Sequence, residues 1–291
     1  MSPKRVVVAV QGEPGCNSAL AAAQCFHEPE ILACDTFAAL FAAVQSRAAA
    51  CGVAPVENSL GGSVHAVWDL LARTPLAVLG EHYLHVRHCL IAHPNVPLQE
   101  IRCVYSHEQA LAQCHRYLAR LVWIEPEGIV PVYDTAGAVK MIKARGRREE
   151  AAIASPEAAA LYGMHVLAQD IQTHARNHTR FLLLSAEPAL PPQVLRLPAA
   201  AAETPVKTTA VLTVEDCARA LPQILGELTE RRIPILKVET RKSVGEPWRY
   251  LIYLDCQGRA ETPPVCQALD AVRTRGVTLC VVGSYPAAPE P

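Results

Sequence analysis

The sequence predicts an α/β protein with about two domains. The prediction rests on the length, on an alternation of strand-like and helix-like segments up to residue 185, and on a different order of segments after residue 206. At 291 residues the chain can form two domains of ordinary size, which run to about 100–200 residues each. Its hydrophobic content of 51% is typical of a chain with a packed core rather than a disordered one.

In the first 185 residues, short apolar runs alternate with helical patterns, which predicts an α/β architecture with largely parallel sheets. We expect strands at Val6–Val10, Ala54–Val56, Ala77–Val78, Val86–Ala92, Cys103–Tyr105, Val130–Tyr133, Ala151–Ala154 and Phe181–Leu184. We expect helices at Ala19–Phe26, Phe37–Ala49, Ala110–Leu118, Ala136–Arg145 and Pro156–Tyr162.

A stretch rich in proline and alanine, residues 186–206, predicts a linker. The segments that follow it have the order β-α-β-β-α-β, which is typical of a small ferredoxin-like domain. They are Thr208–Val214, Cys217–Arg232, Ile235–Thr240, Tyr250–Leu254, Pro264–Arg275 and Thr278–Val282. We therefore divide the chain into a domain at 1–185, the linker at 186–206 and a second domain at 207–291.

Charge and cysteine usage narrow the class of function. The net charge of −1 and the pI near 6.8 give no general attraction to nucleic acid or to an acidic membrane. The apolar run Val6–Val10 is too short for a secretory signal, and no uninterrupted apolar run reaches the 18 residues of a membrane span, so we expect a cytoplasmic protein. Eleven cysteines without a C-x-x-C pair predict neither a metal nor a disulfide framework. The three histidines of "EHYLHVRH", His82, His85 and His88, are interpreted as partly exposed strand residues.

Five junctions share one design, in which a strand ends, small or polar residues follow, and a helix begins. They are "QGEPGCNS", "PVENSLGGS", "YSHEQA", "YDTAGA" and "ASPEAA". Ser106 with Gln109 fits a capping box, and Asp134 or Thr135 can cap the next helix. One such junction is an ordinary helix start, but several together predict a crevice for a small acid, because helix N-termini gather at the carboxyl ends of parallel strands.

The motif "NHTRF" at residues 177–181 adds a full positive charge beside a hydroxyl, since Thr179 and Arg180 precede a run that is apolar throughout. Taken alone, Arg180 would be an ordinary surface arginine. Adjacent strand residues also point to opposite faces, so both would reach one ligand only from a bent strand end. The position beside the apolar run, together with "ENS" at residues 57–59, favours an anion site.

These motifs, together with "GSYP" at residues 283–286, occur in the same order in prephenate dehydratases with a C-terminal ACT domain, which the chain resembles along nearly its whole length. The resemblance implies a bilobal catalytic domain similar to type 2 periplasmic binding proteins. It implies conversion of prephenate to phenylpyruvate, carbon dioxide and water in L-phenylalanine biosynthesis, without cofactor or metal. The implied partners are a dianionic small-molecule substrate, a phenylalanine effector at the ACT domain, and further copies of the chain in a homodimer or homotetramer.

The resemblance also assigns residues. Thr179 is the catalytic hydroxyl, and Arg180 holds a substrate carboxylate. Glu57 either supplies the proton or, equally, fixes Asn58 or Arg180. The other substrate-binding residues that the resemblance implies are Asn58, Ser59, Ser106, His107, Thr135, Ala136, Gly137, Asn177 and Phe181.

The ACT region departs from the family pattern. Arg219, Ala220 and Leu221 stand where the phenylalanine-binding loop of the family reads Gly-Ala-Leu, and Pro234 stands in its Ile-Asn-Leu segment. Glycine allows a close approach to the backbone that an arginine side chain blocks, so we expect a weakened response to phenylalanine. Two further regulatory residues, Glu239 and Arg241, remain from the Glu-Ser-Arg-Pro motif of the family.

Three alternatives stay open. An arogenate dehydratase would act on the analogue that carries an ammonium in place of the keto group, and only the partners of that group distinguish the two activities. A non-catalytic anion sensor could use the same crevice, although such a binder has no need of Thr179 beside the arginine. A prephenate decarboxylase of the same family would lack the Glu-Asn-Ser and Thr-Arg-Phe motifs that this chain contains.

Overall fold

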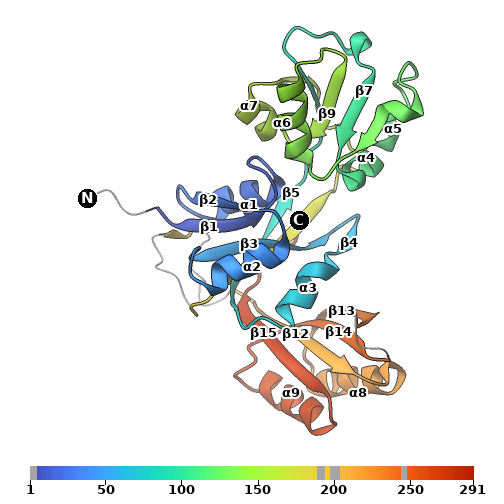
Figure 1. Ribbon diagram of the computed structural model, residues 1–291. Coiled ribbons are helices and arrows are strands. Elements are labelled where there is room, and N and C mark those ends of the chain that lie inside the picture. The colour runs from blue at the N-terminus through green and yellow to red at the C-terminus, as the bar shows by residue number, and fades with distance from the viewer. Residues whose placement is uncertain (1–4, 189–193, 197–203, 244–247) are drawn as a thin grey trace.

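The computed structural model describes residues 5–188, 194–196, 204–243 and 248–291, which form three sheets arranged in a row (Figure 1). We call the parts around the first two sheets lobe 1 and lobe 2, and residues 206–286 the C-terminal unit. Residues 1–4, residues 189–193 and 197–203 of the predicted linker, and residues 244–247 lie outside the described residues.

Lobe 1 contains a sheet with the strand order β2-β1-β3-β11-β5 and a short strand, β4, paired with β3. β1 is parallel to β2 and β3, whereas β11 runs antiparallel to β3 and β5. The elements are β1 (Val7–Gln11), α1 (Asn17–Cys25), β2 (Glu30–Cys34), α2 (Phe37–Gln45), β3 (Cys51–Asn58), β4 (Gly62–Ser63), α3 (His65–Leu71), β5 (Ala77–His85) and β11 (His178–Ser185).

Lobe 2 is inserted between β5 and β11, so two chain crossings connect the lobes. Its sheet has the order β10-β6-β9-β7-β8, with β7 parallel to β8 and β9, and β6 antiparallel to β9 and β10. The elements are β6 (Cys89–Ala92), β7 (Cys103–Ser106), α4 (Glu108–Gln113), α5 (His115–Leu118), β8 (Ile129–Pro131), α6 (Thr135–Arg145), β9 (Glu150–Ala154), α7 (Pro156–Tyr162) and β10 (His165–Ala168).

Both of these sheets are mixed, and the expectation of largely parallel sheets is wrong. The alternation of strands and helices predicts parallel pairing only where a helix connects neighbouring strands. The strands that carry the chain into lobe 2 and back out of it, β5, β6 and β11, pair antiparallel with their neighbours.

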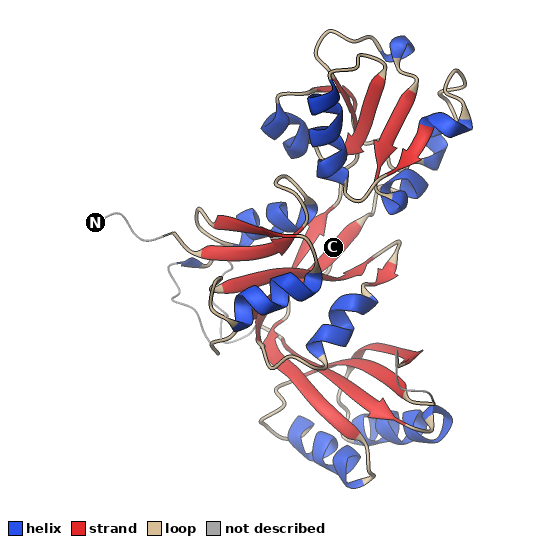
Figure 2. Cartoon of the chain, in the orientation of Figure 1, coloured by secondary structure: helices blue, strands red, loops and turns tan. Residues whose placement is uncertain are grey.

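The C-terminal unit has the predicted βαββαβ order, and its sheet has the strand order β13-β14-β12-β15 with every pair antiparallel. Its two helices cover one face of the sheet, and the other face points toward lobe 1 (Figure 2). The elements are β12 (Val206–Val214), α8 (Cys217–Glu230), β13 (Ile235–Lys242), β14 (Tyr250–Gln257), α9 (Val265–Thr274) and β15 (Thr278–Pro286).

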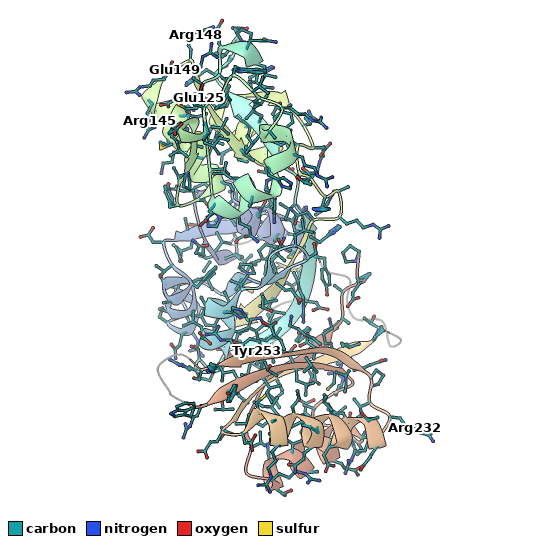
Figure 3. The ribbon with its side chains drawn as sticks, turned by 90° about the vertical axis from the view of Figure 1, so that its right-hand side faces the viewer. Glu125, Arg145, Arg148, Glu149, Arg232 and Tyr253 are labelled. Atoms are coloured by element: carbon teal, nitrogen blue, oxygen red, sulfur yellow. The ribbon has the colours of Figure 1, made fainter. Side chains whose placement is uncertain are left out.

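Lobe 1 and the C-terminal unit share one hydrophobic core. The ring of Tyr253 stacks on Trp68 of α3, with ring centroids 4.7 Å apart and planes 16° apart. Figure 3 shows Tyr253 where the C-terminal unit meets lobe 1. Tyr285 belongs to the same buried cluster as Leu182 and Leu184 of β11. Burial of aromatic surface on this scale holds the C-terminal unit to lobe 1 by packing as well as by the chain connection.

The predicted linker is not wholly a free connector. Its described residues 194–196 lie against lobe 1, where the His27 backbone N–H donates to the Val194 carbonyl and the Arg196 N–H to the Cys25 carbonyl. Within the described ranges, no helix has both the length and the apolar content needed to cross a bilayer.

Candidate active site

A cavity of about 490 Å³ opens between lobes 1 and 2, at strand ends where four of the five predicted junctions meet. The fifth, "ASPEAA" at residues 154–159, contributes no residue to the cavity lining. In the described part of the chain, the polar wall of the cavity combines amides, hydroxyls, imidazoles and one carboxylate. Lobe 1 contributes Gln11, Asn17, Ser18, Asn58, Ser63 and Thr179, and the other side contributes His88, His107, Gln109, Gln113, Asp134 and Thr135.

Thr179 lies near the start of β11, opposite Asn58 of β3 in the strand register. The Asn58 amide nitrogen donates to Thr179 Oγ1 at 3.0 Å and to Asn177 Oδ1 at 2.8 Å. Asn58 Oδ1 accepts from the backbone N–H groups of Leu60 and Gly61, which fixes the orientation of the amide. The Thr179 oxygen therefore acts as an acceptor here. Among the described residues its own proton has no acceptor, so it is available to a ligand in the cavity.

Gln113 of α4 joins this amide group to lobe 2. Its Oε1 accepts from Asn177 Nδ2 at 2.8 Å and lies 2.9 Å from His88 Nε2, while its Nε2 donates to Asn58 Oδ1 at 3.3 Å. Burial lowers the pKa of His88, so the ring is neutral with its proton on Nε2 toward Gln113. The expectation of a partly exposed His88 is wrong, because this side chain closes a buried amide network.

The start of α6 forms another part of the wall. Asp134 caps the helix by accepting the Gly137 N–H at 2.6 Å, and Thr135, the first helical residue, lines the cavity. Burial raises the pKa of Asp134. Ala136 and Gly137 are buried in the first turn behind this surface, and the Gly137 N–H is already bonded to the cap.

The capping box predicted at Ser106 is wrong. Ser106 is the last residue of β7, and its buried hydroxyl donates to the Ile153 carbonyl at 2.6 Å. His107 is the N-cap of α4 instead, with Nδ1 accepting the Gln109 N–H at 3.2 Å. With Nδ1 an acceptor, a neutral His107 carries its proton on Nε2 and lines the cavity as a donor.

Arg180 lies on the opposite face of β11, and it does not line this cavity. Its side chain is 3% exposed, with Nε donating to Glu81 Oε2 at 2.7 Å and Nη1 to Asp255 Oδ2 at 2.6 Å. The expectation that Arg180 holds a substrate carboxylate is therefore corrected. The strand end is not bent enough to bring consecutive side chains to one side, so the alternation along a strand decides the outcome.

Glu57 and Ser59 also lie away from the cavity. Glu57 Oε1 accepts from Lys237 Nζ at 2.8 Å, and its Oε2 is 3.8 Å from Arg180 Nη1. Ser59 donates to the Arg176 carbonyl and accepts the His178 N–H, so it ties the β3 end to the β11 end. Glu57 was considered either as a proton donor or as a residue that fixes Asn58 or Arg180. It lies beside Arg180 and does not line the cavity, which favours the second role. Phe181, by contrast, does line the cavity.

The charge of the cavity is unusual for an anion site. Among the described residues no lysine or arginine lines it, and Asp134 is its one carboxylate. An anion there would be bound by neutral donors and by the positive ends of α1 and α6.

Burial raises the pKa of Cys16 to about 11, so this cavity residue stays a neutral thiol rather than a nucleophile. The described residues contain no group of three His, Cys, Asp or Glu side chains that could hold a metal ion.

A family model described as prephenate dehydratase matches residues 8–189. The chain belongs to the prephenate dehydratase family, a family of hydro-lyases. It is 38% identical over 291 residues to arogenate dehydratase/prephenate dehydratase 2 of Arabidopsis thaliana, covering 97% of this chain and 73% of that protein. It is 34% identical to the bifunctional N-acyl-homoserine lactone acylase/prephenate dehydratase of Komagataeibacter europaeus, covering 97% and 96%. A solved prephenate dehydratase of Arthrobacter aurescens in complex with L-Phe superposes with a TM-score of 0.81 at 27% identity, covering 98% of this chain and 93% of that one.

The residues expected to regulate this family member lie in two separate places. Arg219 and Ala220 line a cavity of about 530 Å³ in the C-terminal unit, and Leu221 packs against the core of that unit. Glu239 and Arg241 are on β13 and face lobe 1 instead, where Glu239 accepts from Ser63 and Arg241 Nη2 donates to Asp69 at 3.2 Å.

The sequence analysis missed several side chains that line the cavity between the lobes. Gln113, His88 and Asp134 were not predicted as site residues, although "SHEQALAQC" and "DTAGA" contain two of them. Helical spacing offered a signal for Gln113, since it lies one turn after the cavity residues Gln109 and Ala110.

Proposed function

We propose that the chain catalyses the decarboxylating dehydration of prephenate to phenylpyruvate in L-phenylalanine biosynthesis. The observation that carries the proposal is the Thr179 hydroxyl, whose oxygen is fixed by Asn58 and whose proton is available to the cavity. The match of the family model to residues 8–189 supports the same reaction class.

In this reaction the electrons of the bond between the ring and its carboxylate move into the ring as carbon dioxide leaves. The C4–oxygen bond breaks, and the departing hydroxyl takes up one proton and leaves as water. Thr179 is a weak acid, so it works as an oriented donor to the departing oxygen, with the net proton coming from solvent through the cleft. Aromatisation of the ring supplies the driving force.

Substrate binding follows from the neutral donors of the wall. The two carboxylates of prephenate would be held by N–H groups at the start of α1, by the Thr135 hydroxyl and by the His107 Nε2–H, with Phe181 against the ring. Arg180 has no part in this binding, since its donors are used by Glu81, Asp255 and Tyr285.

Arogenate is the second candidate substrate, and one observation favours it. Asp134 places a carboxylate in a cavity that no lysine or arginine of the described chain lines, and a carboxylate is a natural partner for an ammonium. Several relatives, including the Arabidopsis protein, are named for arogenate as well as prephenate. A non-catalytic anion sensor is the third candidate.

For the C-terminal unit we propose an ACT domain at 207–291, joined by the linker at 186–206 to the catalytic domain at 1–185. The Arthrobacter enzyme was solved with L-Phe, which supports a phenylalanine effector here as well. Because Arg219 lines the cavity of this unit, we expect reduced sensitivity to phenylalanine. An inhibition curve tests this, and inhibition at low micromolar phenylalanine would refute it. Cytoplasmic location and a homodimeric or homotetrameric state stay predictions.

The deciding experiment incubates the purified protein with prephenate and, separately, with arogenate. Phenylpyruvate and phenylalanine are followed by absorbance and chromatography. Turnover of either substrate establishes a dehydratase, and the ratio of the two kcat/KM values identifies its substrate. Binding without turnover of either substrate would favour the anion sensor.

A further inference from the structure

Four charged side chains lie buried together between lobe 1 and the C-terminal unit. Arg180 and Glu81 belong to lobe 1, and Lys207 and Asp255 to the C-terminal unit, and none is more than 3% exposed. Lys207 Nζ is 3.0 Å from Glu81 Oε1, and Arg180 bridges Glu81 and Asp255. Two positive and two negative charges balance, so the group is neutral as a whole.

The hydrogen bonds around Arg180 close into a ring. Arg180 Nη2 donates to the Tyr285 hydroxyl at 2.9 Å, and Thr209 Oγ1 donates to Asp255 Oδ1 at 2.6 Å. The Tyr285 and Thr209 hydroxyls are also bonded to each other, and since Thr209 gives its proton to Asp255, Tyr285 is the donor of that pair. Every proton in the ring then has an acceptor, and Asp255 accepts with both of its carboxylate oxygens. Burial by itself would lower the pKa of Arg180, but Asp255 and Glu81 raise it above its usual value, so the guanidinium is charged.

This ring lies directly behind the catalytic hydroxyl. Thr179 is the second residue of β11, so little strand precedes it to hold its backbone. On one side Asn58 fixes the Thr179 oxygen, and on the other side the next residue, Arg180, is clamped by the C-terminal unit. The pairing of β11 with β3 shifts register immediately after Arg180, whereas its pairing with β5 stays in register through this strand end. The ladder thus holds the backbone on both sides up to Arg180, and beyond that residue on the β5 side, while the Arg180 side chain adds the link to the C-terminal unit.

We propose that Arg180 is a positioning residue: held by Asp255 of the C-terminal unit and by Glu81, it fixes the start of β11 and so the direction of the Thr179 hydroxyl. The C-terminal unit thus contributes to the catalytic geometry of the cleft as well as to packing. This inference rests on the proposed function, because Thr179 is the donor that it positions.

A purely structural role explains the ring less well. The two parts are already joined by the apolar core that contains Trp68, Tyr253 and Tyr285. Buried ion pairs are often no more stabilising than well-packed apolar residues of the same volume, so adhesion alone does not require four buried charges. What a planar guanidinium with several fixed partners adds is a defined orientation, which is what a positioned donor needs.

Asp255→Asn tests the proposal with the full-length protein, because it keeps the shape and removes the charge that holds Arg180. We expect kcat to fall about tenfold while KM stays within about twofold, since orientation and not substrate binding is lost. Asp270→Asn is the matched control, because Asp270 forms an exposed ion pair with Arg273 on the far side of the same unit, and it should change neither constant. A folded Asp255→Asn protein with unchanged kcat would overturn the proposal. So would one in which KM rises as much as kcat falls, because substrate binding would then be lost as well.

A double variant separates positioning from general loosening. If Arg180 acts through Thr179, adding Asp255→Asn to Thr179→Ala should lower the residual turnover no further, whereas independent damage would multiply the two losses. Multiplied losses would overturn the inference and leave the proposed function intact, while a fully active Thr179→Ala enzyme would overturn the proposed mechanism itself.

Should Asp255→Asn fail to fold, Tyr285→Phe supplies the second test, because it removes one hydrogen bond from Arg180 without leaving a charge unpaired. We expect a fall in kcat of about threefold at constant KM, with the protein folded by thermal melting. An unchanged kcat in this folded variant would count against the proposal.

Discussion

The two faces of strand β11 differ in the charge of their side chains and in the parts of the molecule that they contact. Thr179, Phe181 and Leu183 point toward the cleft and one hydrophobic cluster, and the polar groups on that side are mostly neutral. Arg180, together with Leu182 and Leu184, points toward the C-terminal unit, where charges are buried and paired. The Thr-Arg pair of one motif is therefore divided between the two faces, with the proposed catalytic hydroxyl on one and the guanidinium proposed to fix the strand on the other.

The largest effect is expected from a substitution on the cleft face of β11. Thr179→Ala should lower kcat by about 10²- to 10⁴-fold with little change in KM, because the lost interaction forms with the departing oxygen in the transition state. Steady-state kinetics with prephenate measures both constants. Thr179→Ser is the matched control, since it keeps the hydroxyl, and it should retain much of the activity. Near-full turnover of the alanine variant would show that the proposed mechanism is wrong.

Removing the charge on the other face should act on stability rather than on substrate affinity. Arg180→Gln leaves Asp255 buried without its charged partner and Glu81 with Lys207 alone, which we expect to cost about 3–5 kcal/mol of unfolding free energy. Urea unfolding measures this quantity. Arg273→Gln, which breaks the exposed pair with Asp270, should cost no more than about 1 kcal/mol. A normally stable Arg180→Gln protein with a greatly raised KM would instead restore the role of Arg180 as a substrate ligand.

The residue patterns predicted the architecture well but the directions of side chains poorly. Periodicity located most of the strands and helices, including all six elements of the C-terminal unit. It missed β2 and β10, which lie at sheet edges and are only partly buried, so their apolar alternation is weak. It also missed helix α3, which has only seven residues although it buries Val67, Trp68 and Leu71. Strand direction was mispredicted because pairing direction depends on where the chain crosses between lobes, which no local pattern records.

For the site residues, too, positions along the chain were predicted better than the directions of the side chains. Asn58, His107, Thr135, Thr179 and Phe181 were predicted and do line the cleft, because they lie at strand ends and helix starts. Ser106 and Arg180 were misplaced by one position each, and a shift of one residue on a strand reverses the face. Alternation along the strand places Arg180 on the face opposite Thr179. The prediction gave more weight to the charge of the motif and therefore put both on one face.

Asp134 is the one carboxylate that the described residues place in the cleft, where they place no lysine or arginine. Asp134→Asn keeps a helix cap of equal quality and removes the negative charge, so the KM for dianionic prephenate should fall about threefold and preference should shift from arogenate to prephenate. Asp35→Asn, at an exposed position of lobe 1, should leave KM unchanged.

The pH dependence gives an independent check on Asp134. Its pKa is raised by burial, so in the wild type the KM for prephenate should fall as pH is lowered toward this raised pKa, and the asparagine variant should lack that change. A KM for prephenate that rises in Asp134→Asn would mean that this side chain assists anion binding.

The smallest effect expected concerns His88, which links the cleft face to Gln113. Burial lowers its pKa below the ordinary 6.5, so the unfolded chain takes up a proton before the folded chain does, and stability should fall as pH drops from about 7.5 to 5.5. His88→Gln removes this titration, so the free energy of unfolding should vary less over that pH range. The reduction is at most about 1.4 kcal/mol for each unit by which folding shifts the pKa, and melting temperatures measured at several pH values report it. His82 and His178 also have lowered pKa values, so part of the slope should remain. His165→Gln, at an exposed position, is the control, and an equal slope in the wild type and in His88→Gln would mean that this imidazole is protonated in the folded protein as readily as in the unfolded chain.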